Sequence, residues 1–113
     1  MAVSLAELGI DSIPINALMP IPGTPLEHLP CLTEQDILRT IAFFRYINPE
    51  ANIRLAAGRA LLTKDGETAF QAGASATITG NMLTTAACAT IRSDRSMLAS
   101  LGRDVTPAYW KEA

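Results

Sequence analysis

Histidine and cysteine, the usual ligands of structural zinc, are scarce in this sequence. Its 113 residues include one histidine, His28, and two cysteines, Cys31 and Cys88, which lie far apart and form no C-x-x-C pair. A structural zinc site needs four ligands of this kind, so the sequence argues against a zinc site made by this chain alone. Unpaired thiols are typical of proteins in a reducing cytoplasm.

The sequence also lacks an excess of charge and a long apolar run. The formal net charge is −2 and the basic residues are scattered, so no electrostatic feature indicates nucleic acid or an anionic membrane as a partner. Residues 1–14 have neither a basic segment nor an apolar stretch long enough for a signal peptide or a membrane span. We therefore expect a soluble cytoplasmic protein.

Short apolar runs alternate with helical patterns along the chain. After a helix end closed by Gly9, strands are expected over 10–19, 52–58 and 74–81, and helices over 33–47, 63–73 and 93–101. Strands that alternate with helices favour parallel pairing with right-handed crossovers. The sequence therefore predicts an α/β fold of three consecutive βα units.

Polar residues near helix starts predict the caps. Thr33 precedes acidic residues at the start of the first long helix, Thr63 is expected to cap the second, and Ser93 with Asp94 the last. Gly66 inside the second helical pattern weakens that assignment. Pro14 similarly indicates that the first strand is not a fully paired central strand, or that it contains a bulge.

Two polar side chains stand on the predicted strands. Alternation places Arg54 on the face opposite Ile53 and Leu55, so its guanidinium should meet an anion, a carboxylate or a ligand. The simpler alternative is an arginine at a strand end that reaches solvent or pairs with a glutamate. Asn16 is a second candidate, for which the simpler alternative is a hydrogen bond to neighbouring backbone.

Residues 20–32 include four prolines and one glycine, which exclude a regular helix or strand. A loop of this length between a strand and a helix is often functional or protective. It contains His28, for which a hydrogen bond to backbone is the simpler interpretation and a ligand or acid–base role the alternative.

Three βα units cannot close a barrel. They leave two sheet edges bare, which another chain or self-association would have to cover. In all three strands an apolar face is paired with a face that carries polar residues, as in a barrel with helices outside and a ligand inside. A second interpretation is a phosphate cup at Gly58 and Gly80, the glycines that end the last two strands.

A series of unusual sequence motifs supports a more specific assignment. In order, they are PIN, PI-x-GTPLE, the strand that contains Arg54, AGR and GN-x-LTT. Residues 8–105 closely resemble the C-terminal part of the biotin synthase family, radical S-adenosylmethionine enzymes that insert sulfur into dethiobiotin. The region is called the biotin and thiamin synthesis associated domain. The resemblance implies such a domain over 1–105, a tail over 106–113, and the last three units of a TIM-type (β/α)8 barrel.

The resemblance also implies roles for three residues. Arg54 falls on the arginine that, with three cysteines, holds the family's sulfur-donating [2Fe-2S] cluster. Asn16, in the PIN word, corresponds to an asparagine that binds dethiobiotin, and Met19 to an apolar residue that packs against the adenine of S-adenosylmethionine.

Essential parts of the family pattern are absent from this sequence. It has no C-x-x-x-C-x-x-C motif for the [4Fe-4S] cluster, which cleaves S-adenosylmethionine, and neither Cys31 nor Cys88 falls on a ligand position. We therefore expect no cluster or S-adenosylmethionine to be held by this chain alone, and no sulfurtransferase activity without the N-terminal barrel part as partner. The alternative is a non-catalytic binding or structural module that covers its edges as a homo-oligomer.

Overall fold

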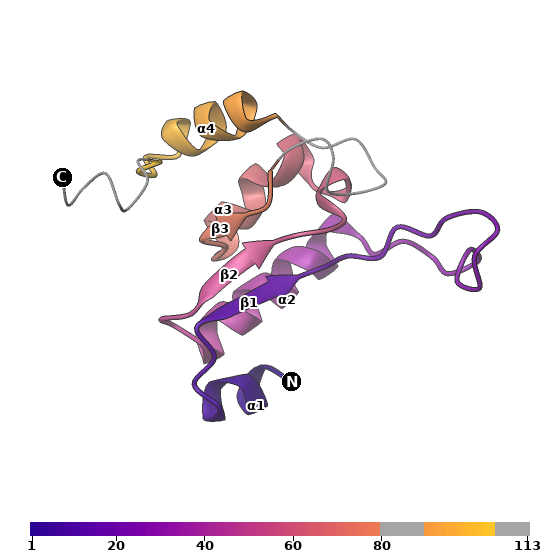
Figure 1. The fold of residues 1–113 in the computed structure, drawn as a ribbon, viewed down its shortest axis with the longest axis horizontal. Coiled ribbons are helices and arrows are strands. Elements are labelled where there is room, and N and C mark those ends of the chain that lie inside the picture. The colour runs from indigo at the N-terminus through magenta and orange to yellow at the C-terminus, as the bar shows by residue number, and fades with distance from the viewer. Residues whose placement is uncertain (80–89, 106–113) are drawn as a thin grey trace. The chain divides into compact units, whose positions relative to one another are not determined.

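The structure is a computed structural model, and it describes residues 1–79 and 90–105 (Figure 1). The chain divides into two units, residues 1–78 and 79–113. The first unit contains the sheet, and the second contains one described helix.

The first unit is built on a parallel sheet of three strands in the order β1-β2-β3. The strands are β1 (Ser12–Ile15), β2 (Asn52–Leu55) and β3 (Ala76–Thr77), with β1–β2 and β2–β3 both parallel. The predicted α/β fold with parallel strands and alternating helices is thus confirmed, although each strand is shorter than predicted.

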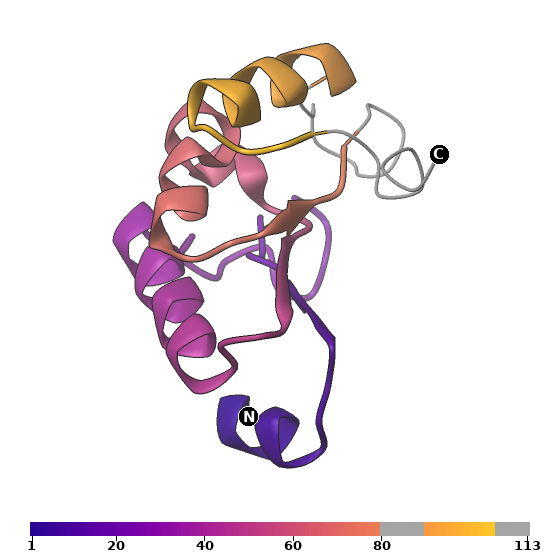
Figure 2. The ribbon, with the colours of Figure 1, turned by 90° about the vertical axis from the view of Figure 1, so that its left-hand side faces the viewer.

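Three α-helices belong to this unit: α1 (Ala2–Glu7), α2 (Glu34–Ile47) and α3 (Glu67–Ala72). Figure 2 shows α2 and α3 on the same side of the strands. Ile41 of α2 and Ile53 of β2 are fully buried between these layers. Burial of apolar area contributes about 25 cal/mol per Å² removed from water, so this core stabilises the unit.

The cap of α2 agrees with the prediction. The Thr33 hydroxyl accepts from the Asp36 N–H at 3.2 Å, and the Asp36 carboxylate accepts from the Thr33 N–H at 3.2 Å, which completes a capping box. The helix ends at Ile47, before Asn48 and Pro49, as predicted. The helix end before Gly9 is also confirmed, because α1 ends at Glu7 and Gly9 has φ +65°.

The predicted start of the second helix, at Thr63, was wrong. Two short 3₁₀ turns, η1 (Arg59–Leu61) and η2 (Thr63–Gly66), precede α3, which begins only at Glu67. Lys64 and Asp65 have left-handed backbone conformations, with φ +49° and +55°, and these interrupt a continuous helix. Thr63 is therefore not the cap of this helix.

The second unit contains α4 (Ile91–Ser100). The prediction that Ser93 and Asp94 cap this helix was wrong, because Thr90 is the cap and accepts from the Ser93 N–H at 3.1 Å. The helix therefore begins earlier than predicted. Gly102 follows its end with φ +74°, as predicted. Gly80, Asn81, Cys88 and the predicted tail over 106–113 lie outside the described residues.

Within residues 1–79 and 90–105, no helix has the length and apolar character needed to span a membrane.

Candidate functional site

Arg54 lies on the sheet face opposite the apolar core. Parallel register pairs it with Pro14 of β1 and Ala76 of β3, so these three side chains share one face. The side chain is half-buried, and its Nε atom is buried without a hydrogen-bond partner in the described part of the chain. A buried guanidinium nitrogen without an acceptor is energetically costly. The face of Arg54 agrees with the prediction from alternation, and an anion, carboxylate or ligand as its partner stays a prediction.

Asn16 is on the same face, two residues beyond Pro14. Its Oδ1 accepts from the Ala57 N–H at 3.0 Å, which ties the end of β1 to the segment after β2. This is the simpler alternative stated for Asn16, a hydrogen bond to neighbouring backbone. The contact uses only the amide oxygen, and the two N–H donors of this exposed residue make no hydrogen bond within the described residues.

Met19 lies beyond the end of β1 and is half-buried, at the start of the proline-rich loop. The loop is irregular, as predicted, and folds through successive turns such as Thr24 N–H to the Ile21 carbonyl at 3.2 Å. His28 is exposed there and pairs with Glu27 at 3.2 Å. Cys31, in the same loop, is exposed as well.

The third strand does not add its threonine to the polar face. Register pairs Thr77 with Leu55, whose side chain is buried in the apolar core, and places Ala76 beside Arg54. The expectation that polar residues of all three strands share one inner face is therefore wrong for β3. A two-residue strand has too few alternating positions for the sequence to specify its register.

Gly58 fixes the approach of the segments that follow β1 and β2. It has φ +88°, and a Cβ built there would lie 2.3 Å from the Ala17 carbonyl oxygen. Close backbone contact and a left-handed conformation thus explain this glycine without phosphate. Gly80, the other half of the suggested phosphate cup, lies outside the described residues.

Arg59, to which the sequence assigned no role, is the most buried arginine described, at 6% exposure. Its Nε and Nη2 donate to the Asp65 carbonyl at 3.0 and 2.8 Å, and its Nη1 donates to the Ile78 carbonyl at 3.0 Å. Arg59 therefore holds the η2 turn and the end of β3 against the segment after β2. The same segment includes Ala57, whose N–H donates to Asn16.

Arg45 has a similar function near the start of the strands. Its Nη1 donates to the Ala51 carbonyl at 2.6 Å and to the Pro49 carbonyl at 3.0 Å, and its Nε donates to the Gly73 carbonyl at 2.9 Å. Both loops that lead into β2 and β3 are thus fixed to α2. The only sequence signal for this role was a basic residue in the last turn of a helix.

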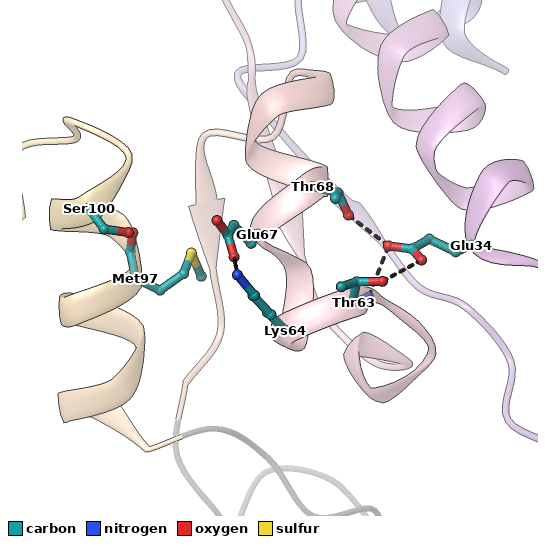
Figure 3. Close-up of polar contacts among 7 residues, drawn as sticks. All are labelled: Glu34, Thr63, Lys64, Glu67, Thr68, Met97 and Ser100. Atoms are coloured by element: carbon teal, nitrogen blue, oxygen red, sulfur yellow. Dashed lines mark hydrogen bonds and ion pairs between the residues drawn. The ribbon is translucent and has the colours of Figure 1, made fainter.

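Glu34 joins the start of α2 to the segment after β2 (Figure 3). Its carboxylate accepts from the Thr63 hydroxyl at 2.7 Å, the Thr63 N–H at 2.9 Å and the Thr68 hydroxyl at 2.7 Å. These hydrogen bonds lower the pKa of Glu34 below its ordinary value, and the bond from the Thr63 hydroxyl has the largest effect. Thr63 thus serves as the donor of an interhelical contact.

The lowered pKa of Glu34 predicts acid-dependent stability. The stability that the ionised Glu34 carboxylate contributes is fully present above its unfolded-state pKa near 4.5. It is lost as the pH falls through the lower folded-state pKa. Glu34→Gln should therefore flatten the fall in urea midpoint below pH 4.5. Glu7→Gln, at an exposed position of α1, is the matched control. An unchanged acid profile for Glu34→Gln would contradict the assignment.

A pocket of about 300 Å³ lies at the amino ends of β1 and β2, the end of the sheet away from Asn16. Its lining includes Gly9, Asp11, Asn48 and Glu50. Ligands of parallel α/β sheets bind at the carboxyl ends of the strands, which is the end where Asn16 lies. Within the described residues, no group of three or more histidine, cysteine or acidic side chains is arranged to hold a metal ion.

Comparison with known proteins places this chain among longer relatives. The model of the biotin and thiamin synthesis associated domain matches residues 14–104. A biotin synthase of Alkaliphilus metalliredigens is 63% identical over 102 residues, one of Clostridium beijerinckii 60% over 102, and one of Brachyspira hyodysenteriae 52% over 102. These alignments cover 90% of this chain but 32%, 32% and 30% of the relatives, so the chain spans about a third of their length.

Proposed function

This chain belongs to the family of the biotin and thiamin synthesis associated domain, and from that premise we propose that it forms the C-terminal barrel wall of a biotin synthase. The complete enzyme inserts sulfur into dethiobiotin. The chain supplies the substrate-side wall, and the N-terminal barrel part supplies the cysteines that this sequence lacks. Alone, the chain is inactive.

The observation that carries this proposal is the buried Nε of Arg54, which has no partner among the described residues. In the proposal, Arg54 is the arginine ligand of the [2Fe-2S] cluster, and it lies on the sheet face opposite α2 and α3. The orphaned Nε–H needs a hydrogen-bond acceptor, and the sulfur atoms of a cluster at this position would be acceptors, while the exposed Cys31 does not contribute. When bound, the two clusters supply the sulfur atom and the electron that cleaves S-adenosylmethionine.

Asn16 and Met19 have binding roles in the same proposal. The Asn16 oxygen is held by the Ala57 N–H, so its amide nitrogen donates to an acceptor of dethiobiotin. Met19 offers a half-buried thioether side chain against which the adenine of S-adenosylmethionine packs. Both residues follow β1, at the carboxyl end of the sheet, where barrel enzymes bind their substrates.

Reassembly tests the function directly. The chain is mixed with the part of the Alkaliphilus metalliredigens biotin synthase that it does not match, and complex formation is measured by sedimentation. We expect a one-to-one complex that forms biotin after reconstitution with iron, sulfide and S-adenosylmethionine, and no biotin from either part. A chain that only self-associates and ignores this partner would instead support the non-catalytic module.

Arg54→Met tests the ligand role separately. Removal of an orphaned Nε leaves no described group without its partner, so the variant should fold and assemble. We expect the visible absorption and electron paramagnetic resonance spectra of the reconstituted [2Fe-2S] cluster to change. Arg39→Met, at an exposed position of α2, is the control and should leave the spectra unchanged. Identical spectra for Arg54→Met and the unmodified complex would exclude Arg54 as a ligand.

A further inference from the structure

The backbone of Ala57 points in the direction opposite to the one that strand alternation predicts. The carbonyls of Ile53 and Leu55, in β2, accept from the N–H groups of Ser75 and Ile78, which flank β3, both at 2.9 Å. Alternate residues of a strand direct their backbone groups to the same neighbouring strand, so those of Ala57 should also face β3. Both groups of Ala57 bond instead to the segment that follows β1.

Two hydrogen bonds hold Ala57 in this direction. Its carbonyl accepts from the Ala17 N–H at 2.9 Å, and its N–H donates to the Asn16 Oδ1 at 3.0 Å. Continuation of the register between β1 and β2 would bring the Ala17 N–H to the Ala56 carbonyl. The ladder is thus shifted by one residue, as in a β-bulge, and bulges next to active sites redirect the groups that face a ligand.

The two residues after Ala57 hold this turned segment in place. Gly58 takes the left-handed conformation, φ +88°, and leaves no room for a Cβ against the segment after β1. Arg59 is 6% exposed, and its guanidinium donates to the carbonyls of Asp65 and Ile78 at 2.8 to 3.0 Å. Ala57, Gly58 and Arg59 form the AGR motif, so each residue of this motif has a part in one local geometry.

We propose that the AGR motif is a positioning element for the substrate, because it selects the orientation of the Asn16 amide. A side-chain amide turns either its oxygen or its nitrogen outward by rotation about χ2. With the oxygen held by the Ala57 N–H, the two N–H donors of Asn16 face outward. The inference rests on the proposed function and deepens it, because it adds residues that act on dethiobiotin through Asn16.

The population of this amide orientation sets the strength of binding. Only the orientation with the nitrogen outward offers donors, so the apparent dissociation constant rises as the population of that orientation falls. Arg59→Lys retains a charge, but an ammonium group lacks the planar fork that reaches two carbonyls from separate segments. We expect the competent population to fall to about one fifth, which weakens binding of dethiobiotin about fivefold.

Dethiobiotin binding to the reassembled complex tests the inference. Calorimetry measures the dissociation constant on the complex with the remaining part of the Alkaliphilus metalliredigens enzyme. Arg45→Lys is the matched control, because Arg45 also donates to main-chain carbonyls but at the amino ends of the strands. The dissociation constant should rise about fivefold for Arg59→Lys and stay unchanged for Arg45→Lys. An equal rise in both variants, or no rise for Arg59→Lys, would overturn the inference.

Hydrogen exchange supplies a second measurement that needs neither substrate nor activity. In the chain alone, the Ala57 amide donates to Asn16, and the neighbouring Ala56 amide donates to the Ile15 carbonyl at 3.1 Å. We expect Arg59→Lys to speed exchange at Ala57 by about tenfold or more while Ala56 stays protected. Equal acceleration at both amides is the result of a merely structural role for Arg59 and contradicts positioning.

Asn16→Asp separates the amide donors from the hydrogen bond to Ala57. The substitution, at an exposed position, keeps an acceptor for the Ala57 N–H but has no donor for a ligand. We expect Ala57 to stay protected and dethiobiotin to bind at least about fivefold more weakly. Unchanged binding would overturn the inference and leave the proposed function standing. An unmodified complex that binds no dethiobiotin contradicts both.

Discussion

Gly58→Ala is expected to destabilise the protein by about 3 kcal/mol or more. The left-handed conformation, φ +88°, costs an alanine about 1–2 kcal/mol. The added Cβ also meets the Ala17 carbonyl oxygen at 2.3 Å and the Ala17 Cβ at 2.7 Å, and overpacking of this kind costs about 1–3 kcal/mol. Chemical unfolding monitored by circular dichroism measures the sum.

Gly23→Ala is the matched control for Gly58→Ala. Gly23 has almost the same φ, +85°, but a Cβ there has no neighbour within 4 Å. It should therefore show only the conformational cost, and the difference between the two variants measures the close contact with Ala17. Equal losses for both variants would mean that the segments after β1 and β2 do not approach as described.

Arg59→Ala should cost about 3 kcal/mol. The guanidinium is buried and donates to the carbonyls of Asp65 and Ile78. Its removal leaves these acceptors without their charged donor and opens a cavity. The free energy of unfolding, extrapolated from urea transitions, is the measurement.

Two further arginine variants make the Arg59 test specific. Arg59→Lys retains the charge but not the planar fork, so it should recover only part of the loss. Arg39→Ala removes an exposed arginine and should change stability by less than about 0.5 kcal/mol. Full recovery by lysine would show that charge alone, and not the geometry of the carbonyl contacts, stabilises this region.

Local patterns explain why much of the fold was predictable. The alternation of strand and helix patterns, the Thr33 cap and the helix stop at Asn48 are each specified by neighbouring residues, and each was confirmed. The side of β2 on which Arg54 lies also follows from alternation alone. The start of α3 was not predictable in this way, because Lys64 and Asp65 take left-handed conformations within the surrounding contacts.

The parts of the site that were missed depend on register and on distant backbone. Thr77 was misassigned because a two-residue strand pairs by tertiary contact, which places Ala76 beside Arg54. Arg45 and Arg59 were not identified because both donate to main-chain carbonyls of other segments. A carbonyl group is common to every residue, so no side-chain pattern marks where an arginine will bind it.

The carbonyl contacts of Arg59 have a consequence for how this family varies in sequence. A side chain that binds main-chain oxygens places no demand on the identity of residue 65 or 78, provided that the backbone there keeps its path. Substitutions at residue 78 should therefore accumulate freely while the arginine is retained, whereas the left-handed backbone at residue 65 limits substitutions there to residues that tolerate this conformation. In an alignment, neither position would therefore co-vary with Arg59 through these contacts, and a contact map inferred from co-variation would omit both connections.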